Sequence, residues 1–300
     1  MNKPCVLALG FFDGVHLGHG GLLHRVRELA DERNLTAAAL TFDTHPDTMV
    51  RGENLPLLNT AEDRAYLMQA YYGVDEMRIL HFDHATMQQP WQDFVLETLA
   101  KEHRAAYVVC GHDFRFGARG EGTPEKLTEL CRSLGIGVDC IPEIRLDGQT
   151  VSSTLIRTLI ERGEMAKAVR FLGHPHVLTG TVVSGQRLGR KLGIPTANMI
   201  LPDGVLIPHF GVYAAKAYFD EKAYIAVVNV GVRPTVHGIG VTVEPWLLDF
   251  DGDLYGKQLR LEFYDFLRPE QKFPDLEALK SEILQNAEQT RIFFENQEKL

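Results

Sequence analysis

The first half of the chain alternates short apolar runs with segments of helical periodicity. The apolar runs predict strands at residues 6–10, 36–42, 77–82, 106–110 and 137–144. Apolar positions between them recur at helical spacing, which predicts helices at residues 22–30, 60–72, 94–100 and 123–134. Strands that alternate with helices are joined by crossover connections. The pattern therefore predicts an α/β domain with a parallel sheet and helices on both faces.

The pattern changes beyond residue 150. Residues 151–172 predict one or two helices, and Gly-His-Pro at residues 173–175 interrupts them. Short strand-like runs then follow one another, separated by turns that contain Gly, Pro or Asp: residues 180–184, 212–219, 224–230, 241–250 and 258–266. This spacing predicts a small antiparallel barrel or sandwich, and residues 276–287 predict a closing amphipathic helix. We therefore expect two domains, residues 1–172 and residues 173–300.

Composition narrows the functional classes. The 300 residues are 45% hydrophobic and 24% charged, as in soluble globular proteins. No apolar run approaches the ~18 residues of a membrane span, the start lacks a signal-peptide pattern, and the four cysteines form no CxxC pair. We expect a cytoplasmic protein without a membrane partner, acting as a monomer or weak oligomer. A net charge of −9 without a basic run disfavours nucleic acid but permits a small phosphorylated ligand.

The motif GFFDGVHLGH at residues 10–19 follows the first predicted strand and opens the first helix. A helix N-terminus there offers free N–H groups and the positive end of the helix dipole to a phosphate. His16 and His19 can face one anion, which suits stabilisation of charge on a nucleotide α-phosphate. Alternatively, they are two surface residues or a metal pair that awaits a third ligand. The dinucleotide and Walker motifs are absent. The candidate phosphate-binding residues of this motif are Gly10, Phe12, Asp13 and Gly18.

Three later segments can converge on the same sheet edge. His45 follows the second strand, and Asp113 lies in GHDFRFG after the strand at residues 106–110. The segment SSTLIR places Ser153 and Thr154 at a predicted helix start and Arg157 one turn later. Hydroxyl and N–H groups at a helix start bind phosphate, and arginine can bridge two of its oxygens. A plain serine N-cap explains SSTLIR equally well.

A glycine-rich segment precedes the strands of the second half. Glycines every four residues let a loop wrap a phosphate, and basic residues add positive charge: Gly185, Gly189, Gly193, Arg190 and Lys191. Thr196 and Asn198 place two oxygen ligands on one side of an extended segment, which suits Mg²⁺ on ATP phosphates. The alternative is a glycine-rich hairpin with incidental basic residues.

Glu244 lies within an otherwise apolar predicted strand. A carboxylate in such a place requires a partner or a function, and a general base for phosphoryl transfer would fit. The alternative is an acidic residue of an edge strand, exposed to solvent.

Nine motifs in chain order carry a resemblance to a known family. GFFDGVHLGH, TFDTHP, GHDFRFG and VSSTLIR resemble the adenylyltransferase module of prokaryotic bifunctional riboflavin kinase/FAD synthetases. GRKLGIPTAN, GVYAAKA, NVGVRPT, VEPWLLDFDGDLYG and LRPEQKF resemble the riboflavin kinase module of that family. Together they cover nearly the whole chain. The resemblance implies a Rossmann-like nucleotidyltransferase domain followed by a six-stranded antiparallel barrel.

The resemblance also implies two reactions, with ATP as co-substrate and Mg²⁺ as metal. In the kinase module, riboflavin and ATP give FMN and ADP. By resemblance, Glu244 accepts the proton of the ribityl hydroxyl, Thr196 and Asn198 hold Mg²⁺, the loop at residues 185–193 covers the phosphates, and Arg268 closes the flavin site.

In the other module, FMN and ATP give FAD and pyrophosphate without an enzyme nucleophile. The resemblance assigns neutralisation of transition-state charge to His16 and His19, and adenosine or phosphate binding to Asp113. It assigns binding of the β- and γ-phosphates to Ser153, Thr154 and Arg157.

A few residues depart from the family pattern. Phe11 replaces the usual asparagine, and Leu155 replaces a frequent arginine; the others are Asp43-Thr44, Ser184 and Pro245-Trp246. These departures leave open a flavin- or nucleotide-binding regulator with one or both activities weakened. A different nucleotidyltransferase would leave GRKLGIPTAN and Glu244 unexplained.

Overall fold

The computed structural model describes residues 3–52, 55–184, 193–235 and 238–297. By its internal contacts the chain divides into two compact units. The first comprises residues 1–57 and 61–153, and the second comprises residues 58–60 and 154–300. The helices at residues 153–172, which the sequence interpretation places in the first domain, therefore count almost wholly with the second unit. The domain limits 1–172 and 173–300 stay a prediction.

The first unit is built on a five-stranded sheet in the order β3-β2-β1-β4-β5. All neighbouring strands are parallel, which confirms the predicted α/β architecture. The strands are β1 (Cys5–Leu9), β2 (Thr36–Phe42), β3 (Glu76–Leu80), β4 (Ala105–Gly111) and β5 (Gly137–Ile141). Chain order reverses between β1 and β4, so their carboxyl ends border the crevice where open α/β sheets bind ligands.

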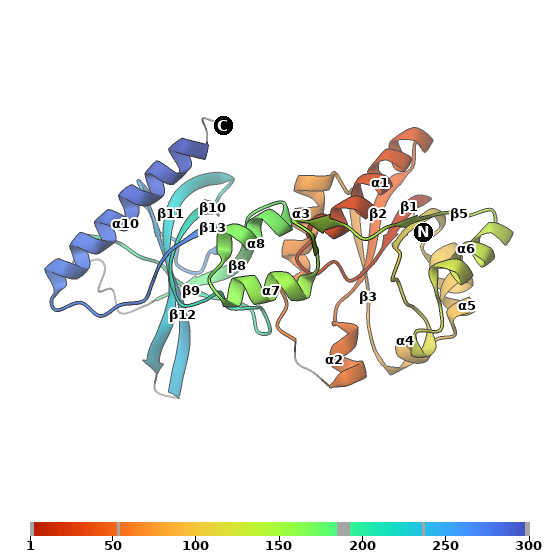
Figure 1. Cartoon of the computed structure of the whole chain (residues 1–300), viewed down its shortest axis with the longest axis horizontal. Coiled ribbons are helices and arrows are strands. Elements are labelled where there is room, and N and C mark those ends of the chain that lie inside the picture. Colours follow the sequence, from red (N-terminus) through yellow and green to blue (C-terminus); the bar gives the residue numbers. More distant parts are fainter. Residues whose placement is uncertain (1–2, 53–54, 185–192, 236–237, 298–300) are drawn as a thin grey trace. The chain divides into compact units, whose positions relative to one another are not determined.

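Helices surround this sheet (Figure 1). The longer ones are α1 (Leu17–Arg33), α3 (Ala61–Tyr72), α6 (Pro124–Ser133) and the π-helix η1 (Phe94–Glu102). The shorter elements are α2 (Pro46–Arg51), α4 (His84–Gln88), α5 (Trp91–Asp93), η2 (Ala118–Gly120), and the hairpin of β6 (Arg145–Leu146) and β7 (Gln149–Thr150). Helix α1 packs on β1, β2 and β4. It buries the apolar stripe that its periodicity predicts: Leu22, Leu23, Val26, Leu29 and Ala30.

The second unit contains a closed barrel of six antiparallel strands in the order β10-β11-β12-β9-β8-β13. They are β8 (His176–Val183), β9 (Asn198–Ile200), β10 (Gly211–Phe219), β11 (Lys222–Thr235), β12 (Gly238–Leu247) and β13 (Gln258–Pro269). The barrel is thus confirmed, although β9 was not predicted as a strand. A three-residue strand is too short to show a periodicity.

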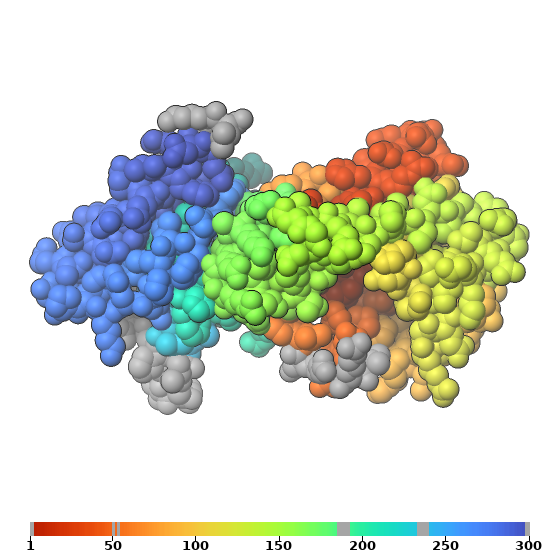
Figure 2. Space-filling model, in the orientation of Figure 1, coloured from red at the N-terminus to blue at the C-terminus, as the bar shows by residue number. Residues whose placement is uncertain are grey.

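Three helices complete this unit: α7 (Ser153–Glu161), α8 (Met165–Leu172) and α10 (Leu276–Gln297). Helix α10 lies along the outside of the barrel against β10 and β11 (Figure 1, Figure 2). None of the helices in the described part of the chain has both the length and the apolar composition that crossing a bilayer requires.

A short segment from the first half of the sequence belongs to the second unit. In residues 58–60, the Leu58 side chain is fully buried and the Asn59 amide donates a 2.7 Å hydrogen bond to the Val177 carbonyl. The chain therefore enters the second unit briefly before returning to build most of the parallel sheet.

Candidate functional site

The turn between β1 and α1 has an unusual backbone. Phe12, Gly14 and Val15 have φ angles of 59°, 82° and 43°. Residues other than glycine adopt this left-handed region at a cost in free energy, and such conformations persist where the surrounding structure enforces them. Contacts with neighbouring elements must therefore hold this turn in place.

The side chain of Phe12 packs beneath the backbone of this turn, in the interior of the unit. It is fully buried, and its ring lies edge-on to the His19 ring with centroids 5.3 Å apart. A Cβ at Gly10 would lie 3.0 Å from the Phe12 ring, so residue 10 must be small. A Cβ at Gly18 would lie 3.0 Å from the His16 imidazole. A side chain at residue 18 would therefore crowd the His16 ring, and phosphate binding at Gly18 stays a prediction.

The structure brings His16 and His19 together. Their rings stack with centroids 3.7 Å apart and planes 16° from parallel. His16 is the N-cap of α1, and its Nδ1 accepts a hydrogen bond from the His19 backbone N–H at 3.4 Å. His16 Nδ1 therefore carries no proton, and the ring can donate through Nε2 toward a ligand.

His19 is held in its neutral form. Burial lowers the pKa of His19 well below its usual value, and electrostatic interactions with His16 and Arg64 act in the same direction. Its Nδ1 atom is buried without a hydrogen-bond partner among the described residues. The described residues also contain no group of three His, Cys, Asp or Glu that could hold a metal ion. The stacked rings and the low pKa of His19 suit a pair of hydrogen-bonding imidazoles.

Other predicted residues lie around the same turn. The Ser153 hydroxyl donates a 2.9 Å hydrogen bond to the carbonyl of Asp13, which is itself buried. His45 caps α2, and its ring lies edge-on to Phe11 with centroids 4.6 Å apart. The exposed Asp113 follows β4, and its carboxylate would lie 3.1 Å from a Cβ at Gly111. Thus Ser153 and His45 lie at the turn, and Asp113 lies in the loop that follows the neighbouring strand.

The two remaining residues of SSTLIR count with the second unit. Thr154 is exposed on the first turn of α7, and Arg157 is buried one turn later. Their part in phosphate binding stays a prediction.

Arg64 is a residue of this region that sequence reasoning missed. It lies on α3 with only 1% of its surface exposed. Its guanidinium donates to the Phe11 carbonyl, to Thr41 Oγ1 at 2.9 Å and to the Phe42 carbonyl at 3.2 Å. The sequence does contain a sign of this residue. Arg64 lies three positions before the buried Leu67, so the helical pattern places a charged residue within the apolar stripe of α3.

Sequence reasoning also missed an aromatic cavity in the first unit, with a volume of about 1110 Å³. Phenylalanines at or just beyond the ends of β2, β3 and β4 contribute to it, together with one from η1. These residues are Phe42, Phe82, Phe114, Phe116 and Phe94. The Phe42 and Phe82 rings meet edge to face at 4.9 Å, and those of Phe114 and Phe116 stack at 5.4 Å. Flat aromatic walls of this kind suit a flat conjugated ligand.

In the barrel, the backbone register brings Asn198 and Glu244 together. Met199 pairs with Val243, and the Ala197 N–H donates to the Pro245 carbonyl at 2.9 Å. This antiparallel register places Asn198 opposite Glu244, so both side chains project from the same face. Glu244 is half-buried.

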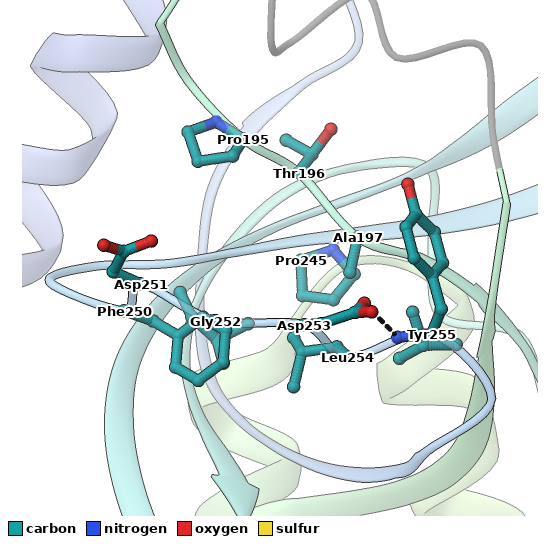
Figure 3. A pocket seen from close by; sticks show the side chains of 12 residues that line it. Pro195, Thr196, Ala197, Pro245, Phe250, Asp251, Gly252, Asp253, Leu254 and Tyr255 are labelled. Atoms are coloured by element: carbon teal, nitrogen blue, oxygen red, sulfur yellow. Dashed lines mark hydrogen bonds between the residues drawn. The ribbon is translucent and has the colours of Figure 1, made fainter.

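A pocket of about 220 Å³ adjoins these strands and includes Thr196 (Figure 3). Tyr255 lines it as well, and its hydroxyl extends toward the same side of the view as that of Thr196. The Asp253 carboxylate accepts a 2.9 Å hydrogen bond from the Tyr255 N–H and so holds this part of the rim. The pocket thus combines a polar rim with the extended segment that contains Asn198.

The glycine-rich loop is only partly described. Gly185, Gly189, Arg190 and Lys191 lie outside the described residues. Gly193 is exposed with a φ angle of 75°. A left-handed φ favours glycine, so residue 193 suits a turn that leads into Thr196.

Arg268 is tied to the C-terminal helix. Its Nε lies 3.0 Å from both Glu282 Oε1 and Asn286 Oδ1. Burial lowers the pKa of Arg268, and the charge of Glu282 opposes that shift. The structure therefore gives Arg268 a role in fixing β13 to α10, and its contact with a flavin stays a prediction.

Comparison with known proteins accounts for both units. The family model "FAD synthetase" matches residues 1–155, and "Riboflavin kinase" matches residues 172–294. A bifunctional riboflavin kinase/FMN adenylyltransferase of Listeria monocytogenes is 35% identical over 299 residues, with 98% of this chain and 93% of the relative covered. A protein of the same name from Escherichia coli K12 is 36% identical over 296 residues, covering 98% and 94%.

A solved structure extends the match to the fold. A crystal structure described as a macrolide-efflux protein from Streptococcus pneumoniae superposes with a TM-score of 0.84 at 29% identity, covering 97% of this chain and 95% of that one. Sequence similarity over nearly the whole length and the two family models agree with each other and with the two units. The chain belongs to the bifunctional riboflavin kinase/FMN adenylyltransferase family.

Proposed function

We propose that this chain makes FAD in two steps: it phosphorylates riboflavin to FMN, and then transfers an adenylyl group from ATP to FMN with release of pyrophosphate. The observation that carries this function is that each matched module has its own arrangement for phosphate chemistry. The stacked histidines lie in the first unit, and Glu244 with Asn198 lies in the second. Both activities are those of a transferase.

In the kinase unit, Glu244 accepts the proton of the ribityl 5′-hydroxyl as that oxygen attacks the γ-phosphorus of ATP. The bond from the γ-phosphorus to the bridging oxygen breaks, and ADP leaves. Removal of the proton makes the hydroxyl oxygen a stronger nucleophile. The half-buried position of Glu244 opposite Asn198 supports this role.

Thr196 and Asn198 fit the metal of this reaction. A hydroxyl and an amide carbonyl are hard oxygen donors. The two residues are two positions apart, so in an extended segment their side chains lie on the same side. Bound there, Mg²⁺ would offset the negative charge of the ATP phosphates. The pocket that includes Thr196 and Tyr255 provides room for part of the nucleotide.

In the adenylyltransferase unit, a phosphate oxygen of FMN attacks the α-phosphorus of ATP and pyrophosphate leaves. The attacking oxygen is already ionised, so the step needs neither a base nor an enzyme nucleophile. His16 and His19 donate hydrogen bonds to the charge that develops, beside the free N–H groups at the start of α1. The low pKa of His19 supports a neutral donor rather than a resident cation in the ligand-free protein.

The proposal extends to the remaining contacts with the substrates. Ser153, Thr154 and Arg157 bind the departing β- and γ-phosphates, and Asp113 contacts the adenosine or its phosphates. The isoalloxazine ring lies in the aromatic cavity beside Phe42 and Phe114, where ring stacking favours a flat heterocycle.

The cellular setting is also part of the proposal. The enzyme works in the cytoplasm on ATP and flavins, without nucleic acid or membrane partners, as a monomer or weak oligomer. The net charge of −9 and the absence of a basic run support small ligands over a phosphate polymer.

Product analysis tests the function. The purified chain is incubated with ATP and Mg²⁺, once with riboflavin and once with FMN, and the products are separated by chromatography. We expect FMN and ADP in the first incubation before FAD accumulates, and FAD and pyrophosphate in the second. Tight flavin binding without either product would instead indicate a regulator.

A further inference from the structure

Arg64 is a buried charge whose hydrogen-bond partners among the described residues are neutral oxygens, although the charges of Asp13 and Asp43 also act on it. It donates to two backbone carbonyls and to the Thr41 hydroxyl, and its Nε atom is buried without a hydrogen-bond partner among the described residues. Burying a guanidinium in this way is costly, and an apolar side chain of similar size would fill the space more cheaply. The position of Arg64 therefore calls for a function.

One hydrogen bond of Arg64 reaches the Phe11–Phe12 peptide directly, and a second reaches Thr41, which contacts the same peptide. The Phe11 carbonyl accepts a hydrogen bond from the guanidinium and another, at 2.8 Å, from the Thr41 hydroxyl. The guanidinium also lies 4.5 Å from the centroid of the Phe11 ring. Both the carbonyl and the ring of Phe11 are therefore held by α3.

That peptide precedes the strained part of the turn. Phe12 follows it with a φ angle of 59°, and the Phe12 ring contacts His19. Left-handed conformations at non-glycine residues persist only when neighbouring groups determine them. The Phe11 carbonyl, fixed by Arg64 and Thr41, is such a determinant.

We propose that Arg64 is a positioning residue of the adenylyltransferase centre, holding the Phe11–Phe12 peptide so that the stacked imidazoles of His16 and His19 keep their orientation toward the nucleotide. This inference rests on the proposed function of the first unit and deepens it. It assigns to α3, an element outside the sequence motifs, a direct part in the geometry of the site.

The proposal is tested by variants of the full-length chain assayed for both reactions. In Arg64→Met, we expect kcat for FAD formation from FMN to fall by about 10²-fold, because a misplacement of about 1 Å can cost that much. FMN formation from riboflavin reports on the other unit and should stay within twofold of the wild type. The matched control is Arg25→Met on α1, whose partners are Asp139 and Glu28 and which should leave both rates unchanged.

Substitutions at Arg64 and Thr41 separate the hydrogen bonds to Phe11 from the positive charge of Arg64. Arg64→Lys keeps a positive charge but cannot bond two oxygens in the same geometry, so FAD formation should be only partly restored. Thr41→Val removes the second hydrogen bond to Phe11, whereas Thr41→Ser keeps it. We expect the valine variant to be slower than the serine variant in FAD formation, with equal FMN formation.

Burial is the main cause of the low pKa of His19, and a titration of His19 by NMR measures the smaller effect of the Arg64 charge, with Arg64→Lys as the comparison that keeps this charge. Because the charge of Arg64 depresses the pKa of His19, Arg64→Met should raise that pKa and Arg64→Lys should not. Full FAD formation by Arg64→Met, an equal loss of both reactions, or identical Thr41→Val and Thr41→Ser rates would overturn the proposal. A wild-type protein that makes no FAD would overturn the proposed function instead. If the pKa of His19 were then also the same in Arg64→Met and in the wild type, the positioning role of Arg64 would be overturned as well.

Discussion

At the scale of single residues, His176 shows what a buried imidazole costs. It is the first residue of β8, only 1% exposed, and neither ring nitrogen has a hydrogen-bond partner among the described residues. Burial, with a smaller effect of His174, lowers the pKa of His176 to about 3. The unfolded chain binds a proton there near pH 6.5, whereas the folded chain does not.

This difference predicts a loss of stability in mild acid. Above pH 6.5 the residue is neutral in both states. Between pH 6.5 and pH 3 the unfolded state binds more protons, so the free energy of unfolding falls by up to about 1.4 kcal/mol per pH unit. His176→Leu should reduce this pH dependence in urea unfolding at pH 7.5 and 5.5, whereas the exposed His84→Leu should not. The same slope in His176→Leu and the wild type would contradict this prediction.

Gly18 provides a second test at residue scale. A Cβ there would lie 3.0 Å from the His16 ring and 3.3 Å from the Val151 carbonyl, so the imidazole must move. We expect Gly18→Ala to slow FAD formation by about 10-fold to 100-fold without changing FMN formation, because the histidine pair loses its orientation. Gly21→Ala on the same helix is the control, since the nearest atom to its new methyl would be Cγ2 of Ile141 at 3.2 Å rather than an atom of the histidine pair. Equal rates for Gly18→Ala and the wild type would show that the position of the His16 ring is not critical.

At the scale of elements, local periodicity predicts which face of a helix is buried but not what the helix packs against. The apolar stripe of α1 identifies all its buried residues except Gly20. Helix α3 was predicted too, yet nothing in its own sequence indicates that Arg64 meets the Phe11 carbonyl. The aromatic cavity was missed for the same reason, because Phe42, Phe82 and Phe114 come together only through the strand order.

The position of Asn198 on β9 leads to a prediction about the Mg²⁺ dependence of FMN formation. Asn198 projects from the face that Glu244 shares, and it is one of the two proposed metal ligands. Asn198→Ala should therefore raise the Mg²⁺ concentration that half-saturates FMN formation by about tenfold, the effect of losing about 1.4 kcal/mol of binding. The control is Ile200→Thr, an exposed position on the same strand. An unchanged Mg²⁺ requirement in Asn198→Ala would remove this residue from the proposed metal site.

At the scale of the whole molecule, two compact units with separate sites predict separable activities. His19→Ala should reduce FAD formation by at least about 10²-fold and leave FMN formation within twofold, because the lost imidazole belongs to the first unit. Glu244→Gln should do the reverse, since the amide cannot accept the hydroxyl proton. Initial rates with riboflavin and with FMN as separate substrates measure both. Parallel loss of the two rates in either variant would contradict independent sites.

The sequence pattern predicted the order of architectures, a parallel α/β sheet followed by a barrel, because strand spacing differs between them. It did not predict that α7 and α8 group with the barrel. Gly173 and Pro175 interrupt the helical pattern, but compactness depends on contacts between distant residues, which a local interruption does not report. The motifs likewise named Asn198 and Glu244 separately, and only the strand register makes them neighbours.

Residues 58–60 impose a practical condition on dissecting this enzyme. A fragment that begins at residue 154 would lack the fully buried Leu58 side chain and the amide that saturates the Val177 carbonyl. It would lose the apolar contacts of Leu58 and one hydrogen bond to the Val177 carbonyl. A single cleavage of the polypeptide therefore cannot leave each compact unit with all of its residues, and an excised barrel keeps these contacts only if the tripeptide is grafted onto it.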